Sequence, residues 1–274
     1  MPSTIARFQL LESVGRNALG ELHRARDLQS GRTVALRVIA RPIADDPVAL
    51  SRLFDAARRA SAASHPALAA IYDCGVADGR AYLATEFVPG QHLSAVIAGA
   101  PLNRRRALDL AAQIADGLAV AHANGLSHGA LDAGAVIVTP KGAAKLLDVG
   151  MMAWTRASAA DLVDDFAAVG ALLFETLVGR PLKRGWPGEL RVPQVPADVR
   201  PVLERLTLAR PGERFDSMAT LAGTLRAIAG ELEPGDPAPP PEQALGHEPA
   251  RSHRTAVLVV LGAAAVAALW WFTR

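Results

Sequence analysis

Residues 14–22 read VGRNALGEL, residues 34–37 read VALR, and residues 128–135 read HGALDAGA. A fourth short stretch, DVG, occupies residues 148–150. Each stretch alone is common, because a pair of glycines after a strand or a single Asp-Val-Gly often arises by chance. Their order and spacing along one chain form a much more specific pattern, and this pattern decides the fold.

The part of the chain around the first two stretches is rich in β-patterned runs. One helix is expected here, from about Val48 to Ala63. Alternating and β-branched residues predict five strands, at Phe8–Val14, Glu21–Ala25, Thr33–Ile39, Leu68–Tyr72 and Ala81–Val88. Residues 1–90 are therefore expected to form a small β lobe with one helix.

The part after Val88 has mainly helical periodicity. Asn103 is placed to cap a helix that ends near Gly125. The apolar face of this helix consists of Leu110, Ile114, Leu118 and Ala121. The other expected elements are strands near 136–138 and 144–147, a helix that starts near Asp165 and stops at Gly179 and Pro181, and a helix over 217–229. Residues 91–232 are thus expected to form a larger, mainly helical lobe, and the fold class is α+β.

Residues 233–249 read EPGDPAPPPEQALGHEP, which is too rich in proline to sustain a helix or a central strand. Three basic or imidazole side chains follow, Arg251, His253 and Arg254. Residues 233–254 are therefore expected to form a spacer and a basic juxtamembrane segment.

Residues 255–272 are expected to form a C-terminal transmembrane helix. The run from Ala256 to Phe272 is apolar apart from Gly262 and reaches about 25 Å as a helix, near the lower limit for a span. Basic residues on its N-terminal side predict a single-pass anchor in the inner (plasma) membrane, with the preceding domain in the cytoplasm. A buried core helix is the alternative. Ala264 and Ala268 have the spacing of helix-packing residues, which would allow a homodimer, although an alanine-rich composition explains that spacing equally well.

Composition excludes several classes of protein. The chain has 29 Lys+Arg against 27 Asp+Glu, so its formal net charge of +2 gives little support to nucleic-acid binding. A single cysteine, Cys74, excludes an internal disulfide and a thiolate zinc cluster. The basic run 104–106 is interpreted as a solvated helix face, with contact to an acidic lipid or partner as the alternative.

Taken in order, the elements and stretches resemble the bacterial Hanks-type serine/threonine protein kinase family over about residues 7–231. The similar segments are Val14–Leu22 (glycine-rich loop), Val34–Arg37 (strand of the phosphate-binding lysine), His65-Pro66, Tyr82–Val88 (gatekeeper and hinge), His128–Ala135 (catalytic loop) and Asp148–Gly150 (magnesium loop). The resemblance implies a two-lobed protein-kinase-like fold that binds ATP and Mg²⁺.

The catalytic loop departs from the family at its reactive positions. The resemblance places an aspartate base at position 130, a lysine at 132 and a metal-binding asparagine at 135, where this chain has Ala130, Asp132 and Ala135. Methyl groups neither accept a proton nor ligate magnesium. Asp132 is interpreted either as a displaced base, which would repel the transferred phosphate, or as a loop aspartate that caps a local turn.

The nucleotide-binding positions implied by the resemblance are Gly15, Gly20, Ala35, Arg37, Glu86 and Val88. Arg37 replaces the phosphate-binding lysine and Asn17 replaces the middle glycine, so we expect phosphate binding to be weakened. Ala56 stands where the regulatory helix would carry a glutamate, and the neighbouring Asp55 points about 100° away around the helix.

Asp148 matches one magnesium ligand of the family and is interpreted either as a metal ligand or as a structural aspartate. The segment that follows, Met151 to Asp164, has only 14 residues, where the family uses a longer loop that carries an Ala-Pro-Glu-like anchor. No such motif is present in this chain. A protein substrate would therefore lack its usual platform.

These losses predict a membrane-anchored pseudokinase with no catalytic residue and no required cofactor. It would act as a regulatory or scaffolding module for a membrane-associated or cytoplasmic signalling protein that the sequence does not identify. One alternative is a divergent ATP-dependent protein serine/threonine kinase or nucleotidyl transferase that uses Arg37, Asp132 and Asp148 with Mg²⁺. The other is a nucleotide sensor in which the hinge Glu86–Val88 receives adenine without catalysis.

Overall fold

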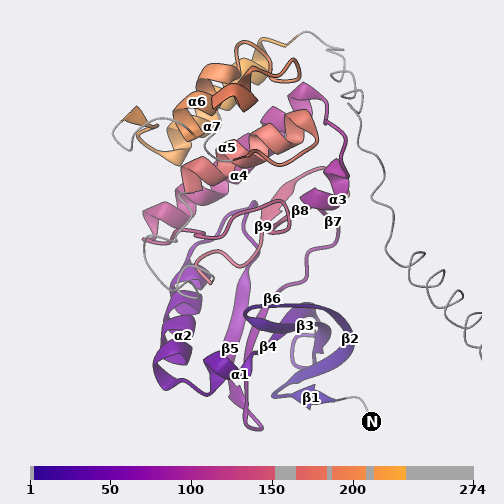
Figure 1. The fold of residues 1–274 in the computed structure, drawn as a ribbon. Coiled ribbons are helices and arrows are strands. Elements are labelled where there is room, and N and C mark those ends of the chain that lie inside the picture. Colours follow the sequence, from indigo (N-terminus) through magenta and orange to yellow (C-terminus); the bar gives the residue numbers. More distant parts are fainter. Residues whose placement is uncertain (1–2, 152–164, 184–186, 208–212, 233–274) are drawn as a thin grey trace, which may run out of the picture. The chain divides into compact units, whose positions relative to one another are not determined.

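The computed structural model describes residues 3–151, 165–183, 187–207 and 213–232, all within a unit that covers residues 1–240. Figure 1 shows a sheet-containing N-terminal part followed by a mainly helical part. The expected α+β class and the protein-kinase-like division into two lobes are therefore observed.

The first lobe is built on a six-stranded antiparallel sheet with the order β1-β2-β3-β4-β6-β5. The strands are β1 (Thr4–Ile5), β2 (Phe8–Asn17), β3 (Gly20–Asp27), β4 (Thr33–Ile39), β5 (Ile71–Ala77) and β6 (Arg80–Glu86). The prediction of five strands was wrong because β1 has two residues, too few to show an alternating pattern, and forms only by pairing with β2.

The fifth expected strand was placed too early. The apolar residues from Leu68 onward suggested Leu68–Tyr72, but β5 begins at Ile71 and pairs with β6 through Ala77. Leu68 instead forms an isolated parallel bridge with Leu146 of the second lobe, and the Ala69 N–H donates to the Leu146 carbonyl at 2.9 Å. The burial of Leu68 in this contact explains why an apolar residue lies outside strand β5.

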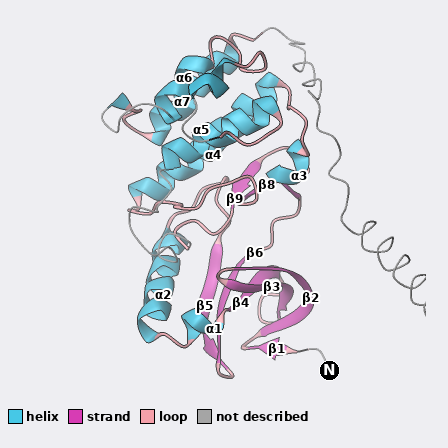
Figure 2. Cartoon of the chain, viewed as in Figure 1, coloured by secondary structure: helices cyan, strands magenta, loops and turns pink. Residues whose placement is uncertain are grey.

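Two helices accompany the first sheet, one more than expected: α1 (Arg41–Ala44) and α2 (Pro47–Ala62). The α2 helix begins where the Asp46 side chain accepts hydrogen bonds from the next two free N–H groups. Its buried face, Leu53, Ala56 and Ala57, packs with Leu83 and other side chains of the sheet. Figure 2 shows α2 beside the strands.

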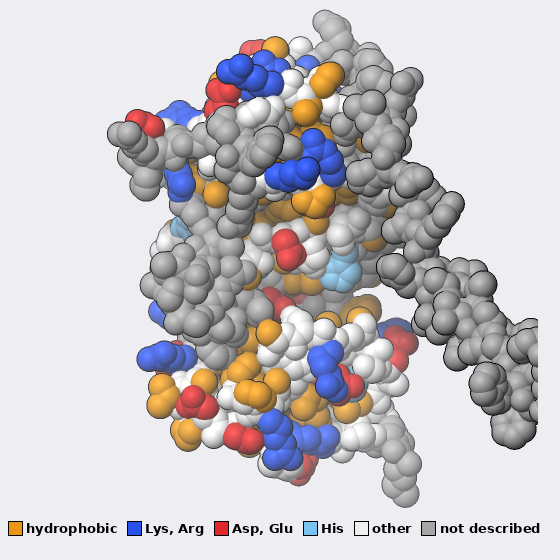
Figure 3. All heavy atoms as spheres, in the orientation of Figure 1, with side chains coloured by type: hydrophobic (Ala, Val, Ile, Leu, Met, Phe, Trp, Pro, Cys, Tyr) orange, Lys and Arg blue, Asp and Glu red, His pale blue; other side chains and the backbone are white. Residues whose placement is uncertain are grey.

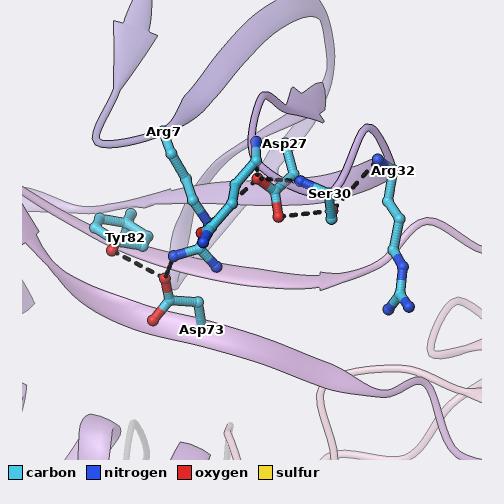
Figure 4. Close-up of polar contacts among 7 residues, drawn as sticks. Arg7, Asp27, Ser30, Arg32, Asp73 and Tyr82 are labelled. Atoms are coloured by element: carbon cyan, nitrogen blue, oxygen red, sulfur yellow. Dashed lines mark hydrogen bonds and ion pairs between the residues drawn. The ribbon is translucent and has the colours of Figure 1, made fainter.

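A polar cluster connects four elements of the first lobe (Figure 4). Arg7, in the β1–β2 turn, forms ion pairs with Asp27 at 3.2 Å and Asp73 at 2.8 Å, and the Tyr82 hydroxyl donates to Asp73 at 3.3 Å. Burial alone would raise the pKa of Asp27, but hydrogen bonds from the following turn, first the Gln29 N–H, lower it below its ordinary value. The cluster thus attaches the N-terminal strand pair to the rest of the sheet.

The second lobe contains a small sheet and the main helices. The sheet has the order β7-β8-β9. The elements are β7 (Gln91–His92), α3 (Leu93–Ile97), α4 (Arg104–Ala123), β8 (Val136–Val138), β9 (Ala144–Leu146), α5 (Asp165–Val178), a 3₁₀ helix (Pro187–Arg191), α6 (Arg200–Thr207) and α7 (Met218–Gly230). The sequence reasoning found the longer helices and missed β7, α3 and α6, which have 2, 5 and 8 residues.

Helix α4 is the centre of this lobe. The Asn103 side chain accepts hydrogen bonds from two N–H groups of its first turn, as expected. The apolar face expected from the sequence (Leu110, Ile114, Leu118 and Ala121) is buried, and the helix packs against α5 and α7. Burial of each leucine or isoleucine on this face contributes about 1.5–3 kcal/mol, so the face adds substantially to the core of the lobe.

The basic run at the start of α4 is a packing junction. Arg105 donates to the Ala229 carbonyl at 2.9 Å and to the Leu232 carbonyl at 2.5 Å, at the end of α7. Arg104 forms an ion pair with Asp198. These contacts favour neither the solvated face nor the lipid contact considered from the sequence, because two of the three guanidinium groups are used within the lobe.

None of the helices in the described residues is both long and apolar enough to cross a membrane. The expected spacer 233–254 and the expected transmembrane helix 255–272 lie outside the described residues.

Candidate functional site

A cavity lies between the first sheet and the second lobe. Its walls include Val14, Leu22 and Ala35 from the sheet and Ile137, Leu147 and Val149 from the second lobe. In the space-filling view of Figure 3 the surface is indented between the two parts, and hydrophobic side chains are visible there. The cavity is therefore a mainly apolar slot between two sheets, with the charged residues Arg37, Glu86 and Asp148 also on its wall.

The structure brings most of the predicted site residues to this cavity. Ala35, Arg37, Glu86, Val88 and Asp148 line it, while Gly15 and Gly20 belong to the β2–β3 hairpin, which contributes other residues to the wall. The catalytic-loop positions Ala130, Asp132 and Ala135 are not part of its wall.

The glycine-rich turn between β2 and β3 is folded onto the inner side of the sheet. Leu19 at its tip is fully buried among residues such as Ile39 and Leu53, and its carbonyl accepts from the Ala40 N–H at 2.8 Å. Gly20 has φ +141°, and a Cβ there would lie 1.9 Å from the Val38 carbonyl oxygen, so only glycine fits. The turn is consequently held in place by the protein itself.

Arg37 forms the centre of a polar cluster inside the cleft. Its guanidinium donates to Asn17 Oδ1 at 2.8 Å and forms an ion pair with Asp148 Oδ2 at 2.7 Å. Asn17 Oδ1 also accepts from the backbone N–H of Leu19 at 3.0 Å. The side chains of Arg37 and Asp148 are 7% and 17% exposed. We call Asn17, Arg37 and Asp148 the Arg37 cluster; it connects the glycine-rich turn to the second lobe.

The regulatory-helix position has no acidic partner for Arg37. Ala56 is buried, and the side chain of Asp55 is 56% exposed and paired with Arg58 on the same helix. The expected separation of Asp55 from the cleft is therefore confirmed, and the charge of Arg37 is balanced by Asp148 instead.

The hinge position Glu86 is bound to the second lobe. Its carboxylate pairs with Lys145 at 2.5 Å and accepts from the Ala70 N–H at 3.2 Å, while Lys145 also donates to the Leu68 carbonyl at 3.3 Å. Sequence reasoning assigned no role to Lys145. The sequence did offer a sign that Lys145 has a role, because it is one of only three lysines in the chain and lies three positions before Asp148.

The catalytic loop keeps its shape through a buried aspartate at the start of α5. Asp165 accepts from the backbone N–H groups of His128 at 2.9 Å and Gly129 at 3.0 Å, and its other contact is His122 Nε2 at 2.8 Å. Burial would raise the pKa of Asp165, but the hydrogen bonds, first that from His122, lower it below its ordinary value. Burial also lowers the pKa of His128.

Asp132 caps its own loop. Its Oδ1 accepts from the N–H groups of Gly134 at 2.8 Å and Ala135 at 3.0 Å. Of the two interpretations of Asp132 made from the sequence, this geometry matches the aspartate that caps a local turn, with Oδ1 facing backbone N–H donors. Ala130 contributes only a methyl group to the loop. The Oδ1 atom of Asp132 is thus engaged within its own loop.

The residues present do not fit a magnesium site. In the described part of the chain no group of three or more His, Cys, Asp and Glu side chains could hold a metal ion. Asp148 is paired with Arg37, and the second ligand position is Ala135. A hard cation needs several oxygen ligands, so this cleft does not supply them.

The fold and this cleft define the chain as kinase-like, and comparison with known proteins agrees. The protein kinase domain family matches residues 8–182, which is more than half of the chain, so the chain belongs to the protein kinase domain family.

Among curated relatives, the serine/threonine-protein kinase PknA of Mycobacterium tuberculosis (strain ATCC 25618 / H37Rv) is 27% identical over 282 residues, covering 87% of this chain and 65% of PknA. PknB from the same strain is 28% identical over 205 residues, covering 64% of this chain and 33% of PknB. The chain thus spans just under two thirds of PknA and one third of PknB.

The crystal structure of the M. tuberculosis PknI kinase domain has a TM-score of 0.72 to this structure at 23% identity, covering 82% of this chain and 98% of that domain. At this identity the likeness shows the fold alone.

Proposed function

We propose that this chain is a catalytically silent serine/threonine pseudokinase that acts as a regulatory or scaffolding module in signalling. The observation that carries the proposal is the Arg37 cluster: the cation expected to hold phosphate and the carboxylate expected to hold magnesium neutralise each other at 2.7 Å. No cofactor is required for this role.

The chemistry of phosphoryl transfer supports the proposal. The reaction depends on metal ions, a cation on the phosphates and a group that positions the attacking hydroxyl, since catalysis is mainly positioning and charge stabilisation. Here Ala130 and Ala135 supply methyl groups at two of these positions, and Asp132 is engaged with backbone N–H groups. Each missing contribution is typically worth about 10²–10⁴ in rate.

Membrane anchoring is part of the proposal and rests on the sequence of residues 255–272 alone. A single-pass helix there would place the kinase-like domain on the cytoplasmic face of the inner (plasma) membrane, at the end of a proline-rich spacer. The partner would be a membrane-associated or cytoplasmic signalling protein, and nucleic acid is not an expected partner.

A phosphate-transfer assay tests the proposal. The full chain, purified in a mild detergent, is incubated with γ-labelled ATP and Mg²⁺ or Mn²⁺ beside an active serine/threonine kinase domain, using a general protein substrate. We expect no label on the chain or the substrate above background. Label that accumulates and disappears with Asp148→Ala would establish the divergent kinase instead.

A ligand sensor without catalysis is the second candidate, and the apolar cavity beside the hinge favours it. A sensor would change its lobe arrangement when the cavity fills. Thermal melting of the full chain with and without nucleotide separates it from a scaffold with an empty cleft, because only ligand binding raises the melting temperature.

A further inference from the structure

We propose that the cavity between the lobes binds an uncharged planar heterocycle, of the size of a purine base or nucleoside, in preference to a nucleoside di- or triphosphate. The inference rests on the proposed function, since a silent domain has no use for a transferable phosphate.

The side-chain oxygen of Asn17, in the glycine-rich turn, already accepts hydrogen bonds from two donors. Asn17 Oδ1 accepts from the Leu19 backbone N–H at 3.0 Å and from the Arg37 guanidinium at 2.8 Å. A backbone N–H of a glycine-rich turn and a nearby cation are the donors with which such turns hold phosphate. The side chain of Asn17 therefore occupies both donors from within, and a phosphate would have to displace it.

The charge of the cavity is balanced without a ligand. Arg37 pairs with Asp148 inside the cleft, and Glu86 pairs with Lys145 at its rear. No lysine precedes Lys141, so no lysine ammonium of the first lobe is offered to a triphosphate. A polyanion placed here would approach Asp148 and would have to break the Asp148–Arg37 pair to gain the cation.

The rest of the cavity suits a flat, uncharged ring. Leu22 and Ala35 lie on one side and Ile137 and Leu147 on the other, and a mainly apolar lining with a few polar groups is typical of small-molecule sites. Within the described part of the chain, no hydrogen bond uses the backbone N–H of Val88, which lies on the wall. An apolar slot with a backbone donor at its edge selects a planar ligand with a matching acceptor.

Isothermal titration of the full chain in detergent with adenosine, ADP and ATP, each with and without Mg²⁺, tests the proposal. We expect adenosine to bind at least about tenfold more tightly than ATP, the factor for one hydrogen bond to a charged group, and Mg²⁺ to change neither affinity. Ala35→Phe should abolish adenosine binding, while Ala143→Phe, at an exposed turn position, should not.

A glycine pair tests the role of the internal oxygen. Asn17→Gly removes that oxygen and should raise ATP affinity about tenfold relative to adenosine. Arg16→Gly is the matched control, because it loosens the same turn and removes only a side chain that is 75% exposed.

Three results would overturn the inference: ATP binding as tightly as adenosine to the unaltered chain, equal effects of the two glycine variants, or no binding of any of the three compounds. The last result would leave the silent scaffold intact, whereas phosphate transfer in the labelling assay would refute the proposed function itself.

Discussion

Replacement of Arg37 by methionine should destabilise the kinase-like domain strongly. The substitution keeps most of the apolar stem and removes the guanidinium, so Asp148 loses its ion pair at 2.7 Å and Asn17 loses a hydrogen bond at 2.8 Å. Because the side chain of Asp148 is only 17% exposed, its charge would be left largely without water or a partner.

The size of the effect follows from this burial. Removing one partner of a fully buried ion pair costs about 3–5 kcal/mol, and the partial exposure of Asp148 reduces this to about 2–4 kcal/mol. For a domain of this size the loss corresponds to a fall of about 5–15 °C in melting temperature. The double variant Arg37→Met/Asp148→Asn should recover part of the loss, since it leaves no unpaired charge.

Thermal melting of the full chain, followed by circular dichroism at neutral pH, measures the effect. Arg41→Met is the control, because Arg41 is 90% exposed and its contact with Asp45 spans 4.0 Å. A stabilising role of the Arg37 cluster is refuted if Arg37→Met melts within about 1 °C of Arg41→Met, because the pair would then contribute no more than a surface contact.

Three further predictions use other parts of the domain. Gly20→Ala should lower the free energy of unfolding, measured with denaturant, by about 2 kcal/mol or more, because its Cβ would clash with the Val38 carbonyl at φ +141°. Gly15→Ala, whose Cβ would meet nothing within 4 Å, should leave the free energy of unfolding unchanged or raise it. Equal losses in the two variants would contradict the geometry. Arg105→Ala should lower the free energy of unfolding by about 1–3 kcal/mol, since it removes two charged hydrogen bonds to the end of α7. A loss below about 0.5 kcal/mol would show that Arg105 does not stabilise the contact between α4 and α7. The pKa of Asp165 is lowered in the folded state. The contribution of Asp165 to stability is therefore complete above the pKa of an unfolded aspartate, about 4, and is lost as the pH falls through the lower pKa of the folded state. Melting temperatures over about pH 3–7 should therefore drop steeply at the acid end, and Asp165→Asn should lower the neutral-pH value and flatten that drop; an unchanged slope would argue against the assignment.

The sequence alone determined the local elements and the missing chemistry. The cap at Asn103 and the apolar spacing of α4 are properties of neighbouring residues, so they were readable from the order of residues. The absence of a carboxylate at Ala130 and of a metal ligand at Ala135 was equally visible once the motifs were aligned. Strand β1 and helices α3 and α6 escaped notice because short elements form only with their tertiary neighbours.

Only the tertiary structure decided what the remaining polar residues do. Arg37 and Asp148 are separated by 111 positions in the chain, and their pairing depends on how the first sheet faces the second lobe. The same is true of Glu86 and Lys145, 59 positions apart. Residue periodicity reports which face of a strand or helix is buried, but it carries no information about which distant charge will meet that face. A replaced lysine and an isolated aspartate in the sequence thus became one neutral cluster in the folded domain.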